Sequence, residues 1–534
     1  MNLPFSKIRR RFTLVVNLLF SAAQPRSRAV IRSARVDDGR ILLSGWAFSN
    51  FQFENCTFVV RKFRDEKISF SYRVNVVRDR KFYFLQYILS QLNLHWLFFT
   101  VKIDAPWAEL PASIYGLGFK TGSTAVSLRL NTSAIQLLSD DAAQRTYCVF
   151  TEPSTLVPRI EMFHFGSETV AEIKEYARQV RDDALACVIG EYTNSARDNG
   201  MVLFEWLREN APDIQASYIV EAINADGYSL APDDVLEFGS VAHLKACLDA
   251  QVCAFTHHRG YTYPYIIKLV AAARYDQTQT LFLQHGVIAL KKNISAHYNF
   301  SRVGYDAFCV SSQLEKTIVI DHFGYPPSNV IVTGLARLDR LVAQSTSVRA
   351  NPREILVFPT WRPGLDKLPS TEIEEHPFIL HWQEALQKLR ATDLHVSLII
   401  HPVLARHIDL FTPYVDNVRE AQDFQEAILN ASALVTDFSS VSFDALFLKK
   451  PVFLFQFDQD THASTNNTYV KTESQMPGQC STTSAALYND ILNSYKNGWP
   501  FDFFAQHALY FDSCDDQNAS RIANVIRSLK PIER

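Results

Sequence analysis

The chain of 534 residues is too long for one ordinary hydrophobic core, and its length predicts two to four domains. Its composition, with 47% hydrophobic and 20% charged residues, is that of a globular protein and excludes a disordered or fibrous chain. The formal net charge of −3 excludes a general affinity for nucleic acid or anionic lipid, so any basic site must be local.

Residues 1–29 combine basic residues with a short apolar run. Four basic residues come before about a dozen mostly apolar residues, and two more follow them. The run is shorter than the roughly 20 residues that a transmembrane helix needs. We therefore expect a helix that lies on an anionic membrane face, with a packed helix or a cleaved signal peptide as the alternatives. No later segment is apolar enough to span a bilayer.

Residues 30–155 have the composition of a β-rich domain. Polar turns separate short runs of β-branched and aromatic residues, among them RILLSGWAFSNF, CTFVVRKF, ISFSYRVNVV and TAVSLRLN. We expect a small sandwich-like domain of strands here. No cluster of catalytic side chains stands out within it, so the chemistry is expected further along the chain.

From about residue 160, short apolar runs alternate with helical patterns. The series begins with SETVAEIKEYARQVRDD and ALACVIGEY, and it restarts at REILVFPTW after a junction near 345–352. Apolar strands of four to eight residues that alternate with helices predict parallel α/β sheets. We therefore predict an α/β fold with two Rossmann-like domains, 156–347 and 348–534, which face each other across a cleft.

Polar side chains follow four of the predicted strands. His285 follows LFLQ, Arg362 follows ILVFPTW, His401 follows VSLII, and 437–440 follow SALVT. Ligands of parallel α/β sheets bind beyond the carboxyl ends of the strands. A buried core histidine explains any one of these positions but does not easily explain all four, which are therefore candidates for anion binding or proton transfer.

Each of these positions also has a simpler structural interpretation. Asp437 or Ser439 can be a plain helix N-cap, and Arg362 can form an ion pair at the surface. Against these stand the hydroxyls of Ser439 and Ser440 at a helix start, which suit a phosphate, and the two-pronged guanidinium of Arg362.

Six blocks of the sequence, by their order and spacing, resemble the CDP-glycerol glycerophosphotransferase family, which builds poly(glycerol phosphate) in teichoic acids and related capsules. The resemblance covers about 185–475, in the blocks NSARDNGMVLFEWLRENAPDI, LQHGVIALKK, HFGYPPSNVIVTGLARLDRL, VFPTWRP, IIHP and VTDFSSVSFDALFLKKPVFLF. It implies a GT-B fold, in agreement with the two α/β domains. One departure is HGVIALKK, in which Val287 and Ile288 replace the small residue and proline of the family's HGTPLK.

The resemblance implies transfer of glycerol phosphate from CDP-glycerol to a hydroxyl group, with CMP as the leaving group. His285 is the candidate general base, because an imidazole titrates near neutral pH, and His401 is assigned with it to the catalytic residues. The residues assigned to the donor phosphates are Arg362, Ser439, Ser440, Asp437 and Lys291. Asp437 could instead orient His401 or cap a helix.

Four further residues are candidates for the walls of the cleft. Asn194, Asp198 and Asn199 belong to the block NSARDNG and are expected at the edge of the first α/β domain. His257 ends an apolar strand together with His258, and at least one of these two histidines is expected to be structural.

The sequence indicates no metal site and requires no cofactor beyond the donor substrate, with a divalent metal as the open alternative. Asp458 and Asp460 imitate the Asp-x-Asp of metal-dependent sugar transferases, but that motif belongs to a different fold. The eight cysteines form no Cys-x-x-Cys pair, a pattern that favours reduced thiols in a cytosolic protein over a zinc site or disulfides.

The expected partners are a CDP-activated alditol, a polymer or lipid-linked glycan acceptor and a membrane surface, with no nucleic acid. The resemblance implies a cytoplasmic enzyme, peripheral on the inner face of the cell membrane. Three alternatives stay open: a CDP-ribitol donor, a GT-B glycosyltransferase that uses a nucleotide sugar, and a non-catalytic polymer-binding protein on the same fold. Only the altered HGVIALKK favours the last of these.

Overall fold

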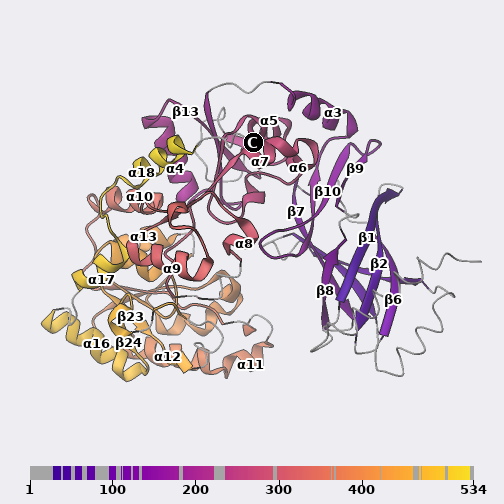
Figure 1. Cartoon of the computed structure of the whole chain (residues 1–534). Helices are drawn as coiled ribbons and strands as arrows, with labels where there is room; N and C mark the ends of the chain where they lie inside the picture. The colour runs from indigo at the N-terminus through magenta and orange to yellow at the C-terminus, as the bar shows by residue number, and fades with distance from the viewer. Residues whose placement is uncertain are drawn as a thin grey trace, which may run out of the picture.

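A computed structural model of the chain shows three sheets along the sequence (Figure 1). It describes residues 28–37, 40–49, 55–62, 69–77, 95–103, 110, 112–121, 124–131, 135–179, 184–221, 235–290, 292, 297–362, 364–365, 368–420, 423–460, 468–470, 472–498 and 503–529. The membrane-binding helix expected within 1–29 and the phosphate ligand Lys291 therefore lie outside the described residues, apart from residues 28 and 29.

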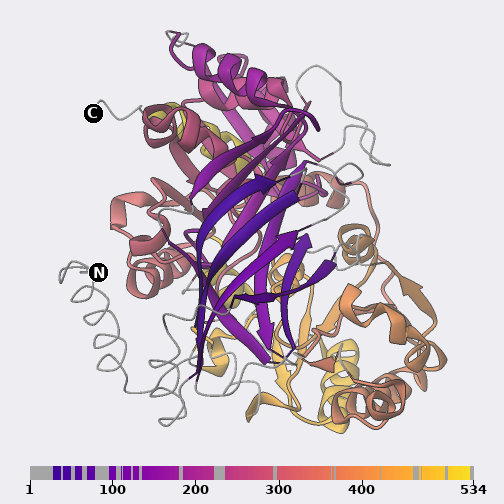
Figure 2. The same cartoon turned by 90° about the vertical axis from the view of Figure 1, so that its right-hand side faces the viewer.

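The N-terminal strands form one sheet, which faces the viewer in Figure 2. Eleven described strands take part, and nine of them follow the order β5-β6-β2-β1-β8-β7-β11-β10-β9. Outside this order, β3 pairs with β7 and β4 pairs with β3. Their bounds are β1 (Arg28–Asp37), β2 (Arg40–Ser49), β3 (Cys56–Lys62), β4 (Ser69–Arg73), β5 (Asn75–Val77), β6 (His95–Ile103), β7 (Ser113–Thr121), β8 (Thr124–Leu130), β9 (Gln136–Asp140), β10 (Arg145–Thr151) and β11 (Pro158–Phe163).

This sheet folds over onto itself, as a sandwich does. Strands β6 and β7 are four places apart in the sheet order, which would separate them by roughly 19 Å in a flat sheet. The ring centroids of Phe99 in β6 and Phe119 in β7 are nevertheless only 5.2 Å apart. Both rings belong to one buried cluster, so the predicted β-rich domain has a core of its own.

The second sheet has seven described parallel strands in the order β14-β13-β12-β15-β16-β17-β18. The strands are β12 (Leu185–Gly190), β13 (Ile214–Val220), β14 (Val235–Glu237), β15 (Val252–Phe255), β16 (Gln279–Phe282), β17 (Ala307–Val310) and β18 (Val330–Val332). Its helices are α3 (Ser167–Tyr176), α4 (Asn199–Asn210), α5 (Val241–Asp249), η4 (Arg259–Tyr261), α6 (Ile266–Val270), α7 (Ala272–Gln277), α8 (Phe300–Val303), α9 (Gln313–Phe323), η6 (Pro327–Asn329) and α10 (Ala336–Ser345). We call this unit the first half.

The third sheet has six described parallel strands in the order β21-β20-β19-β22-β23-β24. The strands are β19 (Glu354–Val357), β20 (His395–Ile399), β21 (Asn417–Arg419), β22 (Ala433–Thr436), β23 (Val452–Phe455) and β24 (Gln479–Ser481). The helices that follow are α11 (Ser370–Glu374), α12 (Pro377–Arg390), η8 (Pro402–Leu410), η9 (Thr412–Tyr414), α13 (Phe424–Asn430), α14 (Val441–Phe447), η11 (Glu473–Gln475), α16 (Ser484–Asn497), α17 (Phe503–Tyr510) and α18 (Asn518–Ser528). We call this unit the second half.

The two parallel sheets confirm the predicted fold class. Their central strands β15, β16, β19 and β22 are buried at every position. A strand covered by helices on both faces carries a continuous apolar run rather than an alternating one. The short apolar runs of the sequence therefore indicated the correct kind of sheet.

Two elements cross the predicted domain boundaries. Strand β11 lies beyond residue 155 but pairs with β7 and β10 of the N-terminal sheet. Helix α18 comes at the end of the second half but lies beside α4 and α10 of the first (Figure 1). Its apolar residues Ala519, Ile522 and Ile526 join the core around α4, so α18 completes the packing of the first half.

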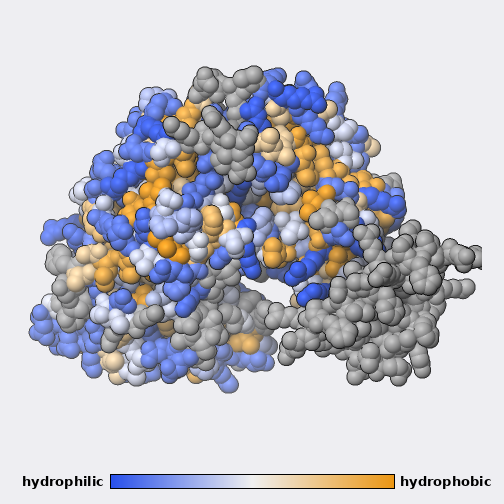
Figure 3. Space-filling model, viewed as in Figure 1, coloured by the Kyte–Doolittle hydropathy of each residue, from blue (hydrophilic) through white to orange (hydrophobic). Residues whose placement is uncertain are grey.

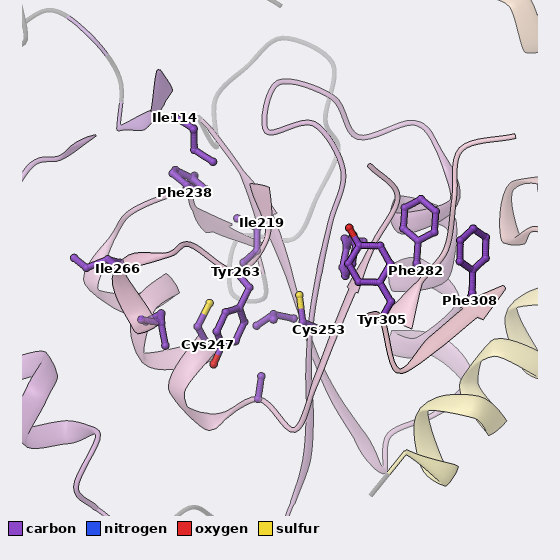
Figure 4. Packing of buried hydrophobic residues seen from close by; sticks show 14 of the residues in the cluster. Ile114, Ile219, Phe238, Cys247, Cys253, Tyr263, Ile266, Phe282, Tyr305 and Phe308 are labelled. Atoms are coloured by element: carbon purple, nitrogen blue, oxygen red, sulfur yellow. The ribbon is translucent and has the colours of Figure 1, made fainter. Parts of the chain in front are cut away.

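The N-terminal sheet is fixed to the first half by polar and apolar contacts. The carboxylate of Glu161 in β11 accepts hydrogen bonds from the N–H groups of Tyr265 (2.7 Å) and Ile266 (3.0 Å). Burial raises the pKa of Glu161 to about 8 although these N–H groups oppose the rise. Figure 4 shows Ile114 of β7 close to Phe238 in the same buried cluster.

The surface of the two halves seen in Figure 3 is mostly hydrophilic, with apolar residues in separate patches. Among the described residues, every helix is too short or too polar to cross a bilayer.

Replacing Gly334 with alanine is expected to destabilise the protein more than the same change at Gly324. Both glycines have positive φ, +76° and +75°, a region that disfavours alanine by about 1–2 kcal/mol. A Cβ on Gly334 would also lie 1.8 Å from Oδ1 of the fully buried Asn518, whereas nothing lies within 4 Å at Gly324. We expect losses in the free energy of unfolding of about 2–5 kcal/mol for Gly334→Ala and about 1–2 for Gly324→Ala. Equal losses in denaturant titrations would contradict the close docking of α18.

Candidate functional site

The predicted site residues follow neighbouring strands in each of the two parallel sheets. Residues 191–194 follow β12, His257 follows β15 and His285 follows β16, three strands that are adjacent in the first half. In the second half, Arg362, His401 and 437–440 follow the adjacent strands β19, β20 and β22. The carboxyl edge of each sheet thus collects the side chains that were singled out.

His285 is exposed at the edge of the first half, beyond β16. Its ring stacks on the ring of His257, with the centroids 4.7 Å apart and 13° between the planes. Tyr192 covers His257 in turn, at 3.7 Å between centroids, and Thr256 Oγ1 lies 2.7 Å from His257 Nδ1. His257, expected only as a residue of the cleft wall, therefore fixes the face against which His285 rests.

The backbone before and after His285 is held by two buried side chains. Gln284 has a positive φ of +48°, and its carbonyl accepts a hydrogen bond of 2.8 Å from Asn199 Nδ2. The carboxylate of Glu315 accepts from Gln284 Nε2 (3.1 Å) and from the N–H of Ile288 (2.6 Å). Burial raises the pKa of Glu315. Asn199 is fully buried, so it lies behind the His285 loop rather than on the open side of the cleft.

The departure from the family's HGTPLK pattern has a packing role. Val287 lies in the apolar cluster that also contains Phe358 and Phe443 of the second half, whereas Ile288 lies in a cluster of the first half. Further along, the N–H of Tyr469 donates to Ala289 O (2.9 Å). The loop after His285 is thus buried between the halves.

Gly286 and Ser440 bring the two halves together beside His285. A Cβ on Gly286 would lie 3.4 Å from Ser440 Oγ. Ser440 precedes α14 without a side-chain cap hydrogen bond to it. His285, Phe438 and Ser440 line a pocket of about 70 Å³. Pockets that bury drug-sized ligands measure roughly 300–1,000 Å³, so this volume fits a small group.

Ser439 is buried, and it shapes the start of α14. Its Oγ accepts a long hydrogen bond of 3.4 Å from the N–H of Val441, and its carbonyl accepts from Ser442 Oγ (2.7 Å). Of the two serines assigned to donor phosphate, Ser440 is the more exposed.

Arg362 and Asp437 form a buried ion pair. Arg362 Nη2 lies 2.9 Å from Asp437 Oδ2, and Arg362 Nε donates to Asp458 Oδ2 (2.7 Å). Arg362 Nη1 donates to the carbonyl of Thr360 (2.7 Å). The guanidinium is therefore already paired with two carboxylates and a carbonyl oxygen, and a phosphate would compete with these partners.

Asp437 connects the ends of β19 and β22. Its Oδ1 accepts from the N–H groups of Thr360 (3.0 Å) and Phe438 (2.7 Å). These contacts give Asp437 a role in holding the two loops, where the sequence suggested a helix cap or a partner of His401. His401 is half-buried and lies beside Trp361, with the ring centroids 5.9 Å apart.

The acidic residues of the site are engaged in other interactions. Asp458 pairs with Arg362, as described above. Among the described residues, no group of three or more histidine, cysteine, aspartate or glutamate side chains could hold a metal ion.

His258, the neighbour of His257, lies 3.1 Å from Glu152 Oε1 and has a lowered pKa because it is buried.

Asn194 and Asp198 have different surroundings at the edge of the first half. Asn194 is exposed. The carboxyl oxygen Oδ1 of Asp198 lies 3.4 Å from Nε of Arg337. Arg337 is a residue that the sequence analysis did not single out. Burial and then the charge of Glu191 raise the pKa of Asp198 to about 8, against the opposing effect of Arg337.

The sequence missed Glu191, Glu315, Arg337 and Asp444. Glu191 accepts hydrogen bonds from the N–H groups of Arg197 and Met201, Glu315 holds the His285 loop, and Arg337 donates to the carboxylate of Asp444. Arg337 and Asp444 do occur in two of the blocks that carry the family resemblance, GLARLDRL and SFDALF. Their position within these blocks was therefore the one signal that could have marked Arg337 and Asp444 as residues of the site. It could not show that the two side chains contact each other.

Comparisons with known proteins agree with this architecture. The sequence model of the family described as CDP-Glycerol:Poly(glycerophosphate) glycerophosphotransferase matches residues 175–528. The chain is similar to a teichoic acid poly(ribitol-phosphate) polymerase of Bacillus spizizenii, with 25% identity over 295 residues that cover 49% of this chain and 45% of the relative. It is also similar to a teichoic acid glycerol-phosphate transferase of Staphylococcus aureus, with 25% identity over 201 residues that cover 35% of this chain and 51% of the relative.

The chain thus spans about half the length of these curated relatives. Among solved structures, the wall teichoic acid polymerase TagF matches with a TM-score of 0.51 and 16% identity, over 68% of this chain and 93% of that chain. At this identity the likeness shows the fold.

Proposed function

Because the chain belongs to the CDP-glycerol:poly(glycerophosphate) glycerophosphotransferase family, we propose that it transfers glycerol phosphate from CDP-glycerol to a hydroxyl group and releases CMP. The acceptor is a growing polyol phosphate or a glycan of teichoic acid or capsule. The observation that carries the proposal is the meeting of His285 and Ser440, from the two halves, at one pocket.

The proposed reaction exchanges one P–O bond for another and moves one proton. The acceptor oxygen attacks the phosphorus atom that carries the glycerol, so a new P–O bond forms and the bond to the bridging pyrophosphate oxygen breaks. CMP leaves with that oxygen, and the proton of the acceptor hydroxyl passes to a base. Positioning and charge stabilisation carry most of the catalysis in such transfers.

His285 is the proposed base, because it is the exposed imidazole at the point where the halves meet. Ser440 and Ser439 are proposed to bind the donor phosphates, together with His401 and with Arg362 once it exchanges a carboxylate for a phosphate. Lys291 keeps its assignment as a proposed phosphate ligand outside the described residues.

CDP-ribitol is the second candidate donor. A relative named as a poly(ribitol-phosphate) polymerase and one named as a glycerol-phosphate transferase are both 25% identical to this chain. The polyol would contact the acceptor side of the cleft, where the two additional CHOH groups of ribitol leave the phosphate chemistry unchanged.

We also place the enzyme at the inner face of the cell membrane. Support comes from the basic and apolar composition of residues 1–29, which suits an anionic interface. A lipid-linked or polymeric acceptor would be presented at the same surface.

A panel of CDP-glycerol, CDP-ribitol and UDP-sugars tests the proposal directly. With a short teichoic acid primer as acceptor, we expect CMP release from CDP-glycerol and a slower or equal release from CDP-ribitol. Release of UDP alone would point to the nucleotide-sugar alternative. If no donor turned over while the protein still bound polymer, the non-catalytic alternative would replace the proposed function.

A further inference from the structure

Arg337, at the start of α10, is a buried cation between the two halves, only 6% exposed. Its Nη1 and Nη2 both donate to the carboxylate of Asp444 in α14, with Nη2–Oδ1 at 2.7 Å. Its Nε faces Asp198 of the first half at 3.4 Å. One guanidinium thus contacts a carboxyl group from each half.

The same residue lies directly behind the His285 loop. The N–H of Arg337 donates to Asn199 Oδ1 (3.0 Å), and Asn199 Nδ2 donates to the carbonyl of Gln284 (2.8 Å), next to His285. A Cβ on Gly286 would lie 3.9 Å from Arg337 Nη2 and 3.4 Å from Ser440 Oγ. The guanidinium therefore lies where the His285 loop meets Ser440.

Stability alone does not account for this cation. The free-energy cost of removing two charges from water largely offsets the attraction within a buried ion pair. Apolar side chains of similar volume often stabilise a protein just as much. A two-pronged arginine–carboxylate contact adds fixed geometry, which apolar packing does not supply. Here that contact joins α14, which begins directly after Ser440, to the start of α10, and α10 is connected to the His285 loop through Asn199.

We propose that Arg337 is a positioning residue, which holds His285 of the first half and Ser440 of the second half at the separation that transfer requires. The inference rests on the proposed function for the roles of His285 and Ser440. Arg337 itself is buried behind the loop, and its guanidinium binds Asp444 on one side while its backbone N–H binds Asn199 on the other.

The variant Arg337→Lys keeps the positive charge and loses the two-pronged contact. We expect kcat with CDP-glycerol to fall by about 10-fold or more, because small displacements of reacting groups slow such transfers strongly. The Kd for CDP-glycerol and the melting temperature should change little. Amide hydrogen exchange should become faster in 284–290 and 438–443 and stay unchanged in the strands of the N-terminal sheet.

Arg340→Lys is the matched control. Arg340 lies on the same helix, and its Nη2 also pairs with a carboxylate, that of Glu205 in α4. Arg340 is half-buried and Glu205 is exposed, with side-chain exposures of 28% and 48%, and the pair joins α10 to α4 within the first half. We expect wild-type kcat and wild-type exchange for this variant.

Asp444→Glu provides a second, milder change in the same pair. If Arg337 acts through Asp444, the double variant Arg337→Lys/Asp444→Glu should lose less than the product of the two single losses. Wild-type kcat and exchange in both single variants would overturn the inference. A loss of kcat that accompanied faster exchange throughout the chain would also overturn it, because that result indicates general destabilisation.

The exchange measurement separates this inference from the proposed function. If the wild type turned over neither CDP-glycerol nor CDP-ribitol, the proposed function would fail. Faster exchange confined to the two segments would still support the connection between the halves, and unchanged exchange would refute it.

Discussion

Replacing His285 with alanine is expected to lower kcat with CDP-glycerol by about 10²–10⁴-fold, the usual contribution of a general base. The side chain is exposed and its loop is anchored through the neighbouring backbone by Asn199 and Glu315. Removing the imidazole therefore leaves the loop in place, and donor binding should stay within a few-fold of wild type. CMP release under saturating donor and acceptor measures kcat, and calorimetry with CDP-glycerol measures binding.

His164→Ala serves as the control for this variant. His164 is also exposed, but it follows β11 and lies outside the strand ends that form the site. It should retain wild-type turnover. Turnover of CDP-glycerol that survived in His285→Ala would remove His285 from the role of base.

Replacing Asp437 with alanine is expected to lower the free energy of unfolding by about 3–5 kcal/mol, the usual effect of removing one member of a buried ion pair. Asp437 has no exposed surface. Its loss would leave the N–H groups of Thr360 and Phe438 without their carboxylate acceptor and would leave Arg362 with Asp458 as its remaining carboxylate. Denaturant titration followed by fluorescence measures the change.

Two further variants separate the charge of Asp437 from its hydrogen bonds. Asp437→Asn keeps an oxygen that can accept from both N–H groups, so its loss should be smaller than that of alanine. Asp458→Asn removes the more exposed partner of Arg362, at 20% side-chain exposure, and should lose only about 1 kcal/mol. If Asp458→Asn were as destabilising as Asp437→Ala, Asp437 would not be the anchor of the two loops.

The architecture was predictable from the sequence because it depends on local patterns. Short apolar runs such as 281–283 and 433–435 are typical of strands covered on both faces, and the helical patterns between them favour parallel connections. The ends of those strands then placed His285, Arg362, His401 and Asp437 at the edges of two sheets. Helix α18 was misplaced because its apolar face has no sequence mark that identifies the half it covers.

The contacts within the site were less predictable, because they join residues far apart in the chain. Arg362 was expected to bind phosphate, and its pairing with Asp458, 96 residues later, follows only from the fold. The pairing of Arg337 with Asp444 spans 107 residues. A single sequence shows which residues are charged and which of them follow a strand. It does not show which oppositely charged residue from a distant part of the chain lies beside them in the fold.

The mass of the acceptor after a single round of reaction tests the central claim most directly. The account predicts that wild-type protein, given CDP-glycerol and a primer with a free hydroxyl, adds one glycerol phosphate unit to the primer for each CMP released. It predicts that His285→Ala adds none on the same time scale. A primer enlarged by a sugar, or left unchanged while CMP accumulates, would contradict it.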